Sequence, residues 1–378
     1  VNPWPVLLMF ENGDISISDL GIKITSAVPT TPWFLPPEQD PEPNEFLWVV
    51  LRVTGQSANF SLNRVNMEGA LAAARMDPGY YWIPSKFNHA YGAWYAPNVY
   101  GTWPPPPLTG TMSVTASTFK NVGMALVAEL LDSAKITIGG SQRAGNNFED
   151  VDQALIVGNL ENSTSEVSYN TILRTYFLGI MLYQGGAWPQ QTASKYVVKH
   201  NTITVAPFYW SEEYWWWPDA IWTVDTEWWG PGVKSQFVVS NNTIRLAPNT
   251  ATGVYGYLDQ GTVISNNQIS GSGWAGDLAQ GSTQCKLLGN NVERFTSEEV
   301  PFEPFVFAPI YLDPDTNNCT VVGGRNATNV VDLGTNNTLT GVNNMQGSAP
   351  GPAIKEAMAR KLELLKQRGL LGLGARLR

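Results

Sequence analysis

The chain has few residues of the types on which most enzymatic chemistry depends. Charged residues make up 15% of its 378 residues, and there are only two cysteines and two histidines, His89 and His200. Metal sites built on His or Cys clusters are therefore not expected. The Gly-rich loop followed by a helix that cradles phosphate groups is absent too. These absences exclude the common metal and nucleotide sites and leave histidine-dependent chemistry with few candidates.

Long apolar runs are also missing, and the charge is uneven. No run approaches the roughly 18 apolar residues of a membrane span. The net charge is −9, and from Pro352 onwards the chain carries seven Lys/Arg and two Glu, so the remainder carries −14. Such a body repels nucleic acid and anionic membrane surfaces, and polyanionic sugars would need local compensation. No signal-peptide pattern is present, so we expect a mature or trimmed chain.

The chain does contain a short sequence motif that recurs. It reads YVVKHNTI at 196–203, FVVSNNTI at 237–244 and TVISNNQI at 262–269. Apolar residues with period 2 predict a strand, and Asn tolerates the left-handed backbone of a corner. A strand, a corner and another strand at near-regular intervals are typical of a solenoid.

The register of the repeat extends over most of the chain. If the last apolar residue before each corner is taken as an anchor, the copies align on Val114, Ile138, Val167, Val198, Val239, Ile264, Leu288 and Val322. Weaker copies lie upstream at Ile17 and Phe60. A basal step of roughly 24 residues suits one coil of three short strands at about 3.3 Å per residue. The Asn, Gly, Thr and Val content argues against an all-helical repeat.

The stretch from Ile17 to Val322 resembles the right-handed parallel β-helix of the pectate-lyase-like superfamily. The resemblance covers about four-fifths of the chain. It implies an all-β solenoid of about ten coils over residues 1–346, with long loop insertions, followed by a linker and an amphipathic C-terminal helix over 347–378. It says little about activity, because the polygalacturonase motifs Asn-Thr-Asp, Asp-Asp, Gly-His-Gly and Arg-Ile-Lys do not occur.

The two cysteines lie in near-equivalent places in successive coils. We place Cys285 and Cys319 in successive coils, one residue apart in register. Stacked coils are about 4.8 Å apart, which is within the Cα separation of a disulfide. A disulfide would fit an extracellular, secreted protein. The alternative is two buried thiols packed as small hydrophobes.

Three excursions interrupt the repeat, where the step rises to 43, 54 and 41 residues. They are the proline-rich stretch 25–45, the aromatic stretch 77–107 and the tryptophan-rich stretch 208–232; a last loop covers about 297–309. Trp and Tyr faces pack on sugar rings. Candidate substrate-binding residues are Trp210, Trp215, Trp216, Trp217, Trp222, Trp228, Trp229, Trp82, Trp94 and Tyr95. These aromatics could equally fold inward as small cores or form a protein–protein interface.

The third excursion also contains the candidate catalytic carboxylates. If residues 219–228 form a strand, Asp219, Asp225 and Glu227 share one face, and Trp222 and Trp228 the other. The Cα atoms of Asp225 and Glu227 would be roughly 6.6 Å apart. Such a pair can act as acid and base on a glycosidic bond, can bind Ca²⁺, or can be solvated loop carboxylates.

Other polar residues give weaker signals. β-Elimination of a uronate would need a base such as Lys195, Lys199 or Arg174. His200 takes a place that Asn241 and Asn266 fill in sister coils, and we predict a corner residue there.

The C-terminal tail predicts a helix that begins at Pro352 and stops at Gly369. Ile354, Met358, Leu362 and Leu365 fall on one face of it. We expect this helix to cover the open end of the last coil. A partner-docking helix and a basic amphipathic anchor are the alternatives.

Together these features predict an extracellular β-helix that recognises a carbohydrate, with cleavage by a polysaccharide-lyase or glycoside-hydrolase mechanism as a further expectation. No cofactor beyond Ca²⁺ is expected. The alternative is a non-catalytic structural or adhesive protein that self-assembles through its aromatic loops.

Overall fold

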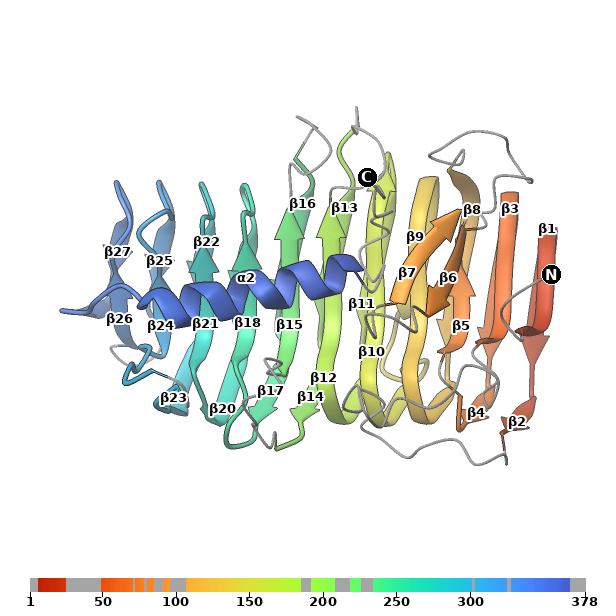
Figure 1. The fold of residues 1–378 in the computed structure, drawn as a ribbon, viewed down its shortest axis with the longest axis horizontal. Coiled ribbons are helices and arrows are strands. Elements are labelled where there is room, and N and C mark those ends of the chain that lie inside the picture. Colours follow the sequence, from red (N-terminus) through yellow and green to blue (C-terminus); the bar gives the residue numbers. More distant parts are fainter. Residues whose placement is uncertain are drawn as a thin grey trace.

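The chain folds as a parallel β-helix, as the repeat predicts. The computed structural model describes residues 6–24, 49–70, 72–77, 80–84, 91–95, 107–184, 192–207, 218–225, 234–300, 303–324 and 328–367. Parallel strands from successive turns of the chain pair along the whole length of the solenoid (Figure 1). Only one hairpin, β6 (Tyr80–Pro84) with β7 (Tyr91–Tyr95), is antiparallel among the described strand pairs.

The strands form three faces, here named A, B and C, and up to β23 each turn of the chain adds one strand segment to each face; the described strands of the last turns, β25 to β28, belong to faces A and C. Five strands bend through a corner and contribute to more than one face: β1 (Val6–Ser18), β3 (Val49–Asn63), β9 (Thr118–Gly139), β10 (Asn147–Glu161) and β12 (Thr171–Gln184). Up to β23, the chain passes through face C, then face A, then face B in each turn.

The remaining strands belong to single faces. Face A contains β8 (Leu108–Thr115), β11 (Thr164–Ser168), β13 (Lys195–Lys199), β16 (Gln236–Ser240), β19 (Val263–Ser265), β22 (Lys286–Leu288), β25 (Thr320–Val322) and β27 (Thr338–Thr340). Face B contains β2 (Gly21–Lys23), β4 (Asn66–Glu68), β14 (Thr202–Val205), β17 (Thr243–Leu246), β20 (Gln268–Gly273) and β23 (Asn291–Ser297). Face C contains β5 (Ala72–Met76), β15 (Asp219–Asp225), β18 (Thr252–Tyr257), β21 (Ala275–Gln280), β24 (Ile310–Leu312), β26 (Thr328–Asp332) and β28 (Val342–Met345).

The inner column of face A confirms most of the predicted register. Val114, Ile138, Val167, Val198, Val239 and Ile264 pair in succession, and all are buried. Three anchors were wrong: the inward residues are Leu287, Val321 and Leu62 in place of Leu288, Val322 and Phe60. Leu288 and Val322 are apolar residues that point outward, and Phe60 lies one inward position earlier in its strand, so the last apolar residue before a corner is not always the inward one there.

The corner between faces A and B is held by a ladder of buried asparagines. Its rungs are Asn146, Asn170, Asn201, Asn242, Asn267 and Asn290. In each rung the Oδ1 atom accepts from the Nδ2 atom and the backbone N–H of the previous Asn, at 2.9–3.2 Å. Each Nδ2 also donates to a face A carbonyl, as Asn242 does to Val198 at 3.1 Å. The ladder thereby satisfies backbone groups that the corner removes from strand pairing.

The residue before each ladder asparagine makes the turn. His200, Asn241 and Asn266 have φ of 56°, 55° and 54°, which is the left-handed region. His200 is thus a corner residue, as predicted, and its exposed ring stacks on Tyr169 at 4.9 Å. The two polar residues of the repeat therefore have different roles. The first adopts the left-handed backbone conformation of the turn, and the side chain of the second forms the hydrogen bonds of the ladder.

A ladder of serines lines the corner between faces C and A, and a disulfide joins two later coils on face A. Ser163 and Ser194 accept from the N–H of the preceding coil's residue through Oγ, and Ser194 N–H donates to Ser235 Oγ at 3.1 Å. On face A, in the column that contains Phe237 and Thr262, Cys285 and Cys319 form a disulfide, with Cα atoms 4.5 Å apart. Their strands pair with no offset, so the expected one-residue shift was wrong.

The C-terminal helix α2 (Pro352–Gln367) does not cover the end of the last coil. It runs back along the solenoid in front of face C (Figure 1). Ile354 and Ala357 are fully buried and Met358 is half-buried, while the side chains of Leu362 and Leu365 lie outside the described part. The end-capping prediction was therefore wrong, because the apolar side of the helix finds its partner on a lateral face. No described helix is long and apolar enough to cross a membrane.

One inward position of face C carries a carboxyl group. Asp277 pairs with Val254 in one neighbouring coil and with Ile310 in the other, and it is fully buried. Burial raises the pKa of Asp277 to about 7 from 3.8, opposed by the side chain of Asn290. The solenoid interior therefore holds a carboxyl group that stays protonated below neutral pH.

We predict that removing one asparagine of the ladder strongly lowers the free energy of unfolding. Asn242→Ala removes one acceptor for two buried donors of Asn201, and we expect a loss of about 3 kcal/mol of unfolding free energy. Equilibrium unfolding in guanidinium chloride measures it. Asn241→Gly, at the adjacent left-handed position, is the control and should cost less than about 0.5 kcal/mol. Equal losses in the two variants would contradict the role of the ladder.

The buried Asp277 predicts that stability falls as the pH rises. The folded pKa is above the unfolded value, so between about pH 4 and pH 7 only the unfolded state releases the proton, at a cost of about 1.4 kcal/mol per pH unit. Asp277→Asn should match the wild type at pH 4 and unfold at a higher temperature at pH 8. Thermal unfolding followed by circular dichroism measures this, and a constant difference at both pH values would refute it.

Candidate functional site

All long insertions between β1 and β23 flank face C. Residues 25–48 and 206–218 join face B to face C, and residues 77–107, 185–194 and 226–235 join face C to face A. The corner between faces A and B carries no segment longer than 140–146. The aromatic excursions therefore rise from the two edges of one face. This makes face C, with its edges, the candidate functional site.

The third excursion is divided by a strand. β15 (Asp219–Asp225) pairs with β12 on one side and β18 on the other, and every residue in it is buried. The expected single loop over 208–232 was therefore wrong: the strand β15 divides it into a connection from β14 on face B and a connection to β16 on face A. Trp210, Trp215, Trp216, Trp217, Glu227, Trp228 and Trp229 belong to those connections, outside the described residues.

Trp222 is the one proposed Trp contact whose side chain is described, and it is buried. It lies on the side of β15 opposite Ile221, which belongs to the apolar core. Its ring is 1% exposed and stacks on Tyr255 with centroids 5.3 Å apart and planes at 4°. A ring face that packs on a neighbouring ring is not offered to a sugar, so in this arrangement Trp222 contributes to packing.

The outer side of face C is a continuous buried row. It runs from coil to coil through Met181, Trp222, Tyr255, Leu278, Tyr311 and Val331. Phe305 and Phe307 from the last loop pack against Tyr311 edge-on, with centroids 6.2 and 4.9 Å away, and Phe307 also stacks on Trp274. These aromatics form a small core outside the solenoid, as the inward-folding alternative predicts.

The first coils of face C carry a buried ionic network in place of this row. Arg52 donates to Asp77 Oδ1 at 2.7 Å, and Arg75 donates to Asp77 Oδ2 at 2.5 Å and to Glu129 Oε2 at 2.7 Å. Tyr183 donates to Glu129 Oε1 at 2.8 Å. All five side chains are at most 5% exposed. Within the described part of the network, two guanidinium groups balance two carboxylates, and the contacts join four coils.

A glycine lets the tyrosine reach this network. Gly158 lies between Glu129 and Tyr183 in the register of face C. A Cβ atom at Gly158 would be 1.9 Å from Tyr183 Cε1. The ring thus lies across the missing side chain and spans an intervening coil to Glu129. The network could not be predicted from the sequence, because its members are spread over residues 52–183 and form no motif. Only the stacking of the coils brings them together.

The proposed carboxylates Asp219 and Asp225 do not form a pair. They begin and end β15, six residues apart, which is about 20 Å in an extended strand. Glycosidase carboxyl groups are about 5–9.5 Å apart. Asp219 accepts from the N–H and the hydroxyl of Thr252 at 3.1 and 2.6 Å. Asp219 is therefore a structural residue at the start of the strand.

Asp225 lies at the foot of the second Trp-rich segment. Its Oδ1 atom is 3.4 Å from Nζ of Lys234, and these two residues bracket residues 226–233. Close by, Thr223 donates to Asp259 at 2.5 Å, and burial raises the pKa of Asp259 well above its usual value. Asp225 is 3% exposed, so it is placed to close the base of the loop that carries Glu227.

The hairpin β6–β7 holds three further candidates, Trp82, Trp94 and Tyr95. Its backbone register pairs Trp82 with Ala93 and Tyr80 with Tyr95, while the side chains lie outside the described part. In Figure 1 this hairpin is drawn in front of β5 and β9, and β7 contacts α2.

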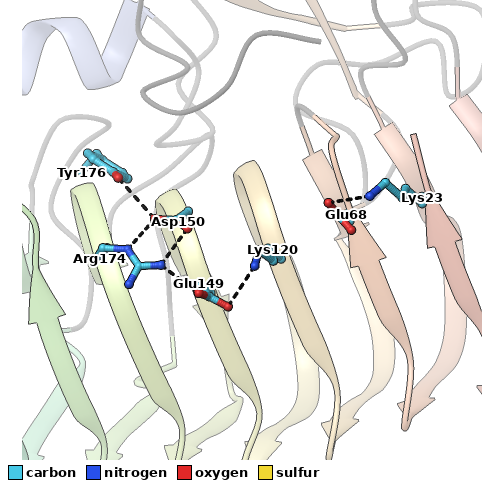
Figure 2. Close-up of polar contacts among 7 residues, drawn as sticks. All are labelled: Lys23, Glu68, Lys120, Glu149, Asp150, Arg174 and Tyr176. Carbon is cyan, nitrogen blue, oxygen red and sulfur yellow. Dashed lines mark hydrogen bonds and ion pairs between the residues drawn. The ribbon is translucent and has the colours of Figure 1, made fainter. Parts of the chain in front are cut away.

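The candidate bases for β-elimination do not lie together. Arg174, on face B, donates to Asp150 Oδ1 at 2.6 Å and to Glu149 Oε1 at 2.8 Å, and these hydrogen bonds raise its pKa further (Figure 2). Figure 2 shows this network continuing to Lys120 and Tyr176. Lys195 and Lys199 are on face A, where Lys199 Nζ is 3.2 Å from Glu166. Lys195 directly follows residues 185–194, and Arg174 lies where face B turns into face C, beside Val205 at the start of the insertion 206–218. Both bases therefore adjoin insertions, but they lie at different corners of the solenoid.

Metal binding finds no support in the described residues, which contain no group of three or more His, Cys, Asp or Glu side chains able to hold an ion. The Ca²⁺ expectation depends on Glu227, outside that part of the chain.

Comparison with known proteins gives no family. No family model, curated protein or solved structure matches this chain. The fold and the placement of its insertions therefore define the class: a parallel β-helix with one elaborated face.

The geometry around Gly158 predicts a specific steric effect. Gly158→Ala places a methyl group inside the Tyr183 ring and should cost about 2 kcal/mol of stability. Urea unfolding measures it. In a Tyr183→Ala background the same substitution should cost much less, because the colliding ring is gone. A cost that persists in that background would show that Gly158 has another role.

Proposed function

We propose that the protein is an extracellular member of the pectate-lyase-like β-helix superfamily that binds a polysaccharide along face C, between the aromatic insertions at its edges. The polymer would lie along the solenoid axis, so that successive residues of the polymer meet successive coils. The one observation that carries the proposal is that every long insertion between β1 and β23 flanks this face. Those insertions hold most of the 15 tryptophans of the chain.

The charge favours an uncharged polymer. The described part of the buried network on face C is neutral, and the chain without its tail carries −14. A polyanionic chain such as polygalacturonate would approach against this field. Neutral glucans and mannans have apolar ring faces for Trp and Tyr and meet no such repulsion.

Extracellular placement is supported by the disulfide. Cys285 and Cys319 are buried and joined by a disulfide between successive coils. Disulfides persist in oxidising compartments and are rare in the cytosol.

Binding is better supported than cleavage. Asp219 and Asp225 are buried and engaged by Thr252 and Lys234, so Glu227 is the remaining candidate acid of the three. Burial of Trp222, Asp219 and Asp225 also favours the second candidate function, a non-catalytic structural protein that self-associates through its loops.

Affinity electrophoresis tests the proposal. Mixed-linkage β-glucan and galactomannan should retard the protein, and polygalacturonate should not. Trp215→Ala and Trp228→Ala should each weaken retention about tenfold, since loss of one stacking ring costs about 1–2 kcal/mol. Reducing-sugar release with wild type and Glu227→Gln separates cleavage from binding.

The matched control is Trp274→Phe, a buried aromatic of face C whose neighbour is Phe307. It should leave retention unchanged. Absence of retention by all neutral polymers, together with concentration-dependent association in sedimentation velocity, would replace the proposal with the structural alternative.

A further inference from the structure

We propose that the C-terminal segment, residues 346–367, is a releasable cover on face C that competes with the polysaccharide for this face. The inference rests on the proposed function for the identity of the competing ligand. The cover itself is argued from contacts of the segment with the solenoid.

The segment enters over the last coils. Gly347 lies against Val331, and a Cβ atom there would be 2.3 Å from Val331 Cγ1. Tyr311 of the outer row donates its hydroxyl hydrogen to the carbonyl of Ser348 at 2.9 Å. Both solenoid residues belong to the buried outer row of face C, so the segment is in direct contact with that row.

The start of α2 is fixed by a side chain from the loop at the edge of face C. The first turn of α2 has no acidic residue, so its N-terminal N–H groups lack a carboxylate of their own. Glu303 supplies one: its Oε2 atom accepts from the N–H of Ile354 at 3.1 Å. Gly351 leaves room for it, because a Cβ atom there would collide with the Glu303 carboxylate.

The helix then covers the middle of face C. Figure 1 shows α2 crossing in front of β24, β21, β18, β15 and β12. Ile354 and Ala357 on the helix are fully buried, and so are Trp222 and Tyr311 on the outer side of the strands. Without a cover these outward-pointing rings would be in contact with water.

The attachment is slight compared with that of the coils. Residues 343–349 are all exposed, and two hydrogen bonds, Tyr311 to Ser348 and Ile354 to Glu303, tie the start of the segment to the solenoid. In the solenoid, one asparagine rung alone contributes two hydrogen bonds between neighbouring coils, and strand pairing contributes further ones. Segments with few buried contacts open at lower free energy than the core.

The test uses full-length protein, with Gly347→Ala to displace the entry of the segment. Its methyl group meets Val331, a short side chain that cannot swing away. Ser348→Ala is the matched control, since the contact to Tyr311 uses the Ser348 carbonyl, which alanine retains. Hydrogen exchange of α2 and of β18 is followed by mass spectrometry, and retention by mixed-linkage β-glucan and galactomannan by affinity electrophoresis.

Two results are expected. In the wild type, α2 amides exchange at least about tenfold faster than β18 amides under native conditions, and saturating polymer accelerates exchange in α2. Gly347→Ala raises affinity for the retained polymer about tenfold, because the covered fraction no longer has to open first, while Ser348→Ala does not.

Each failure has its own meaning. If α2 exchanges only together with β18, the segment is part of the rigid core and the inference is overturned whatever binds. If Gly347→Ala loosens α2 and leaves polymer affinity unchanged, the segment opens without competing and the inference is also overturned, while the proposed function stands. If neither polymer is retained by either protein, the proposed function fails instead.

Discussion

The structure depends on one repeated interaction, the stacking of buried asparagine side chains at the corner between faces A and B. Each side chain accepts two hydrogen bonds from the coil before it and donates one to a face A carbonyl. A corner takes backbone groups out of strand pairing in an interior that water does not reach, where each unpaired group costs about 1–3 kcal/mol. The ladder meets that requirement with one residue per coil, and so the same corner recurs.

The same constraint explains where the chain varies. A rung works only if the next asparagine lies one coil away, so an insertion that displaces the corner breaks two rungs. The corners on either side of face C have no continuous ladder of this kind, and the long insertions of 24–31 residues are found there. The serine ladder beside face C is short and runs from Ser163 through Ser194 to Ser235. The long insertions are therefore found around one face.

The fold could be predicted from the sequence because its determinants are local and repeated. The eight-residue motif that ends in Asn-Asn-Thr-Ile includes the residues that form the strand, the left-handed corner residue and the ladder asparagine. The register failed at Leu288 and Val322, where an outward residue is apolar, since hydrophobicity alone does not distinguish the two sides of a strand. The site was harder. Asp219 and Asp225 were placed on one face of a strand, as alternation requires, but their burial followed from coils on either side.

The sequence by itself determined the parallel solenoid, the corner positions, the placement of Cys285 and Cys319 in successive coils and the helix that begins at Pro352. These follow from short-range patterns of polarity and backbone preference. Only the tertiary structure decided that the insertions share one face, that Tyr183 reaches Glu129 across Gly158, and that α2 lies on face C rather than over the end. Those relations join residues tens to hundreds of positions apart, and stacking and burial, not local sequence, fix them.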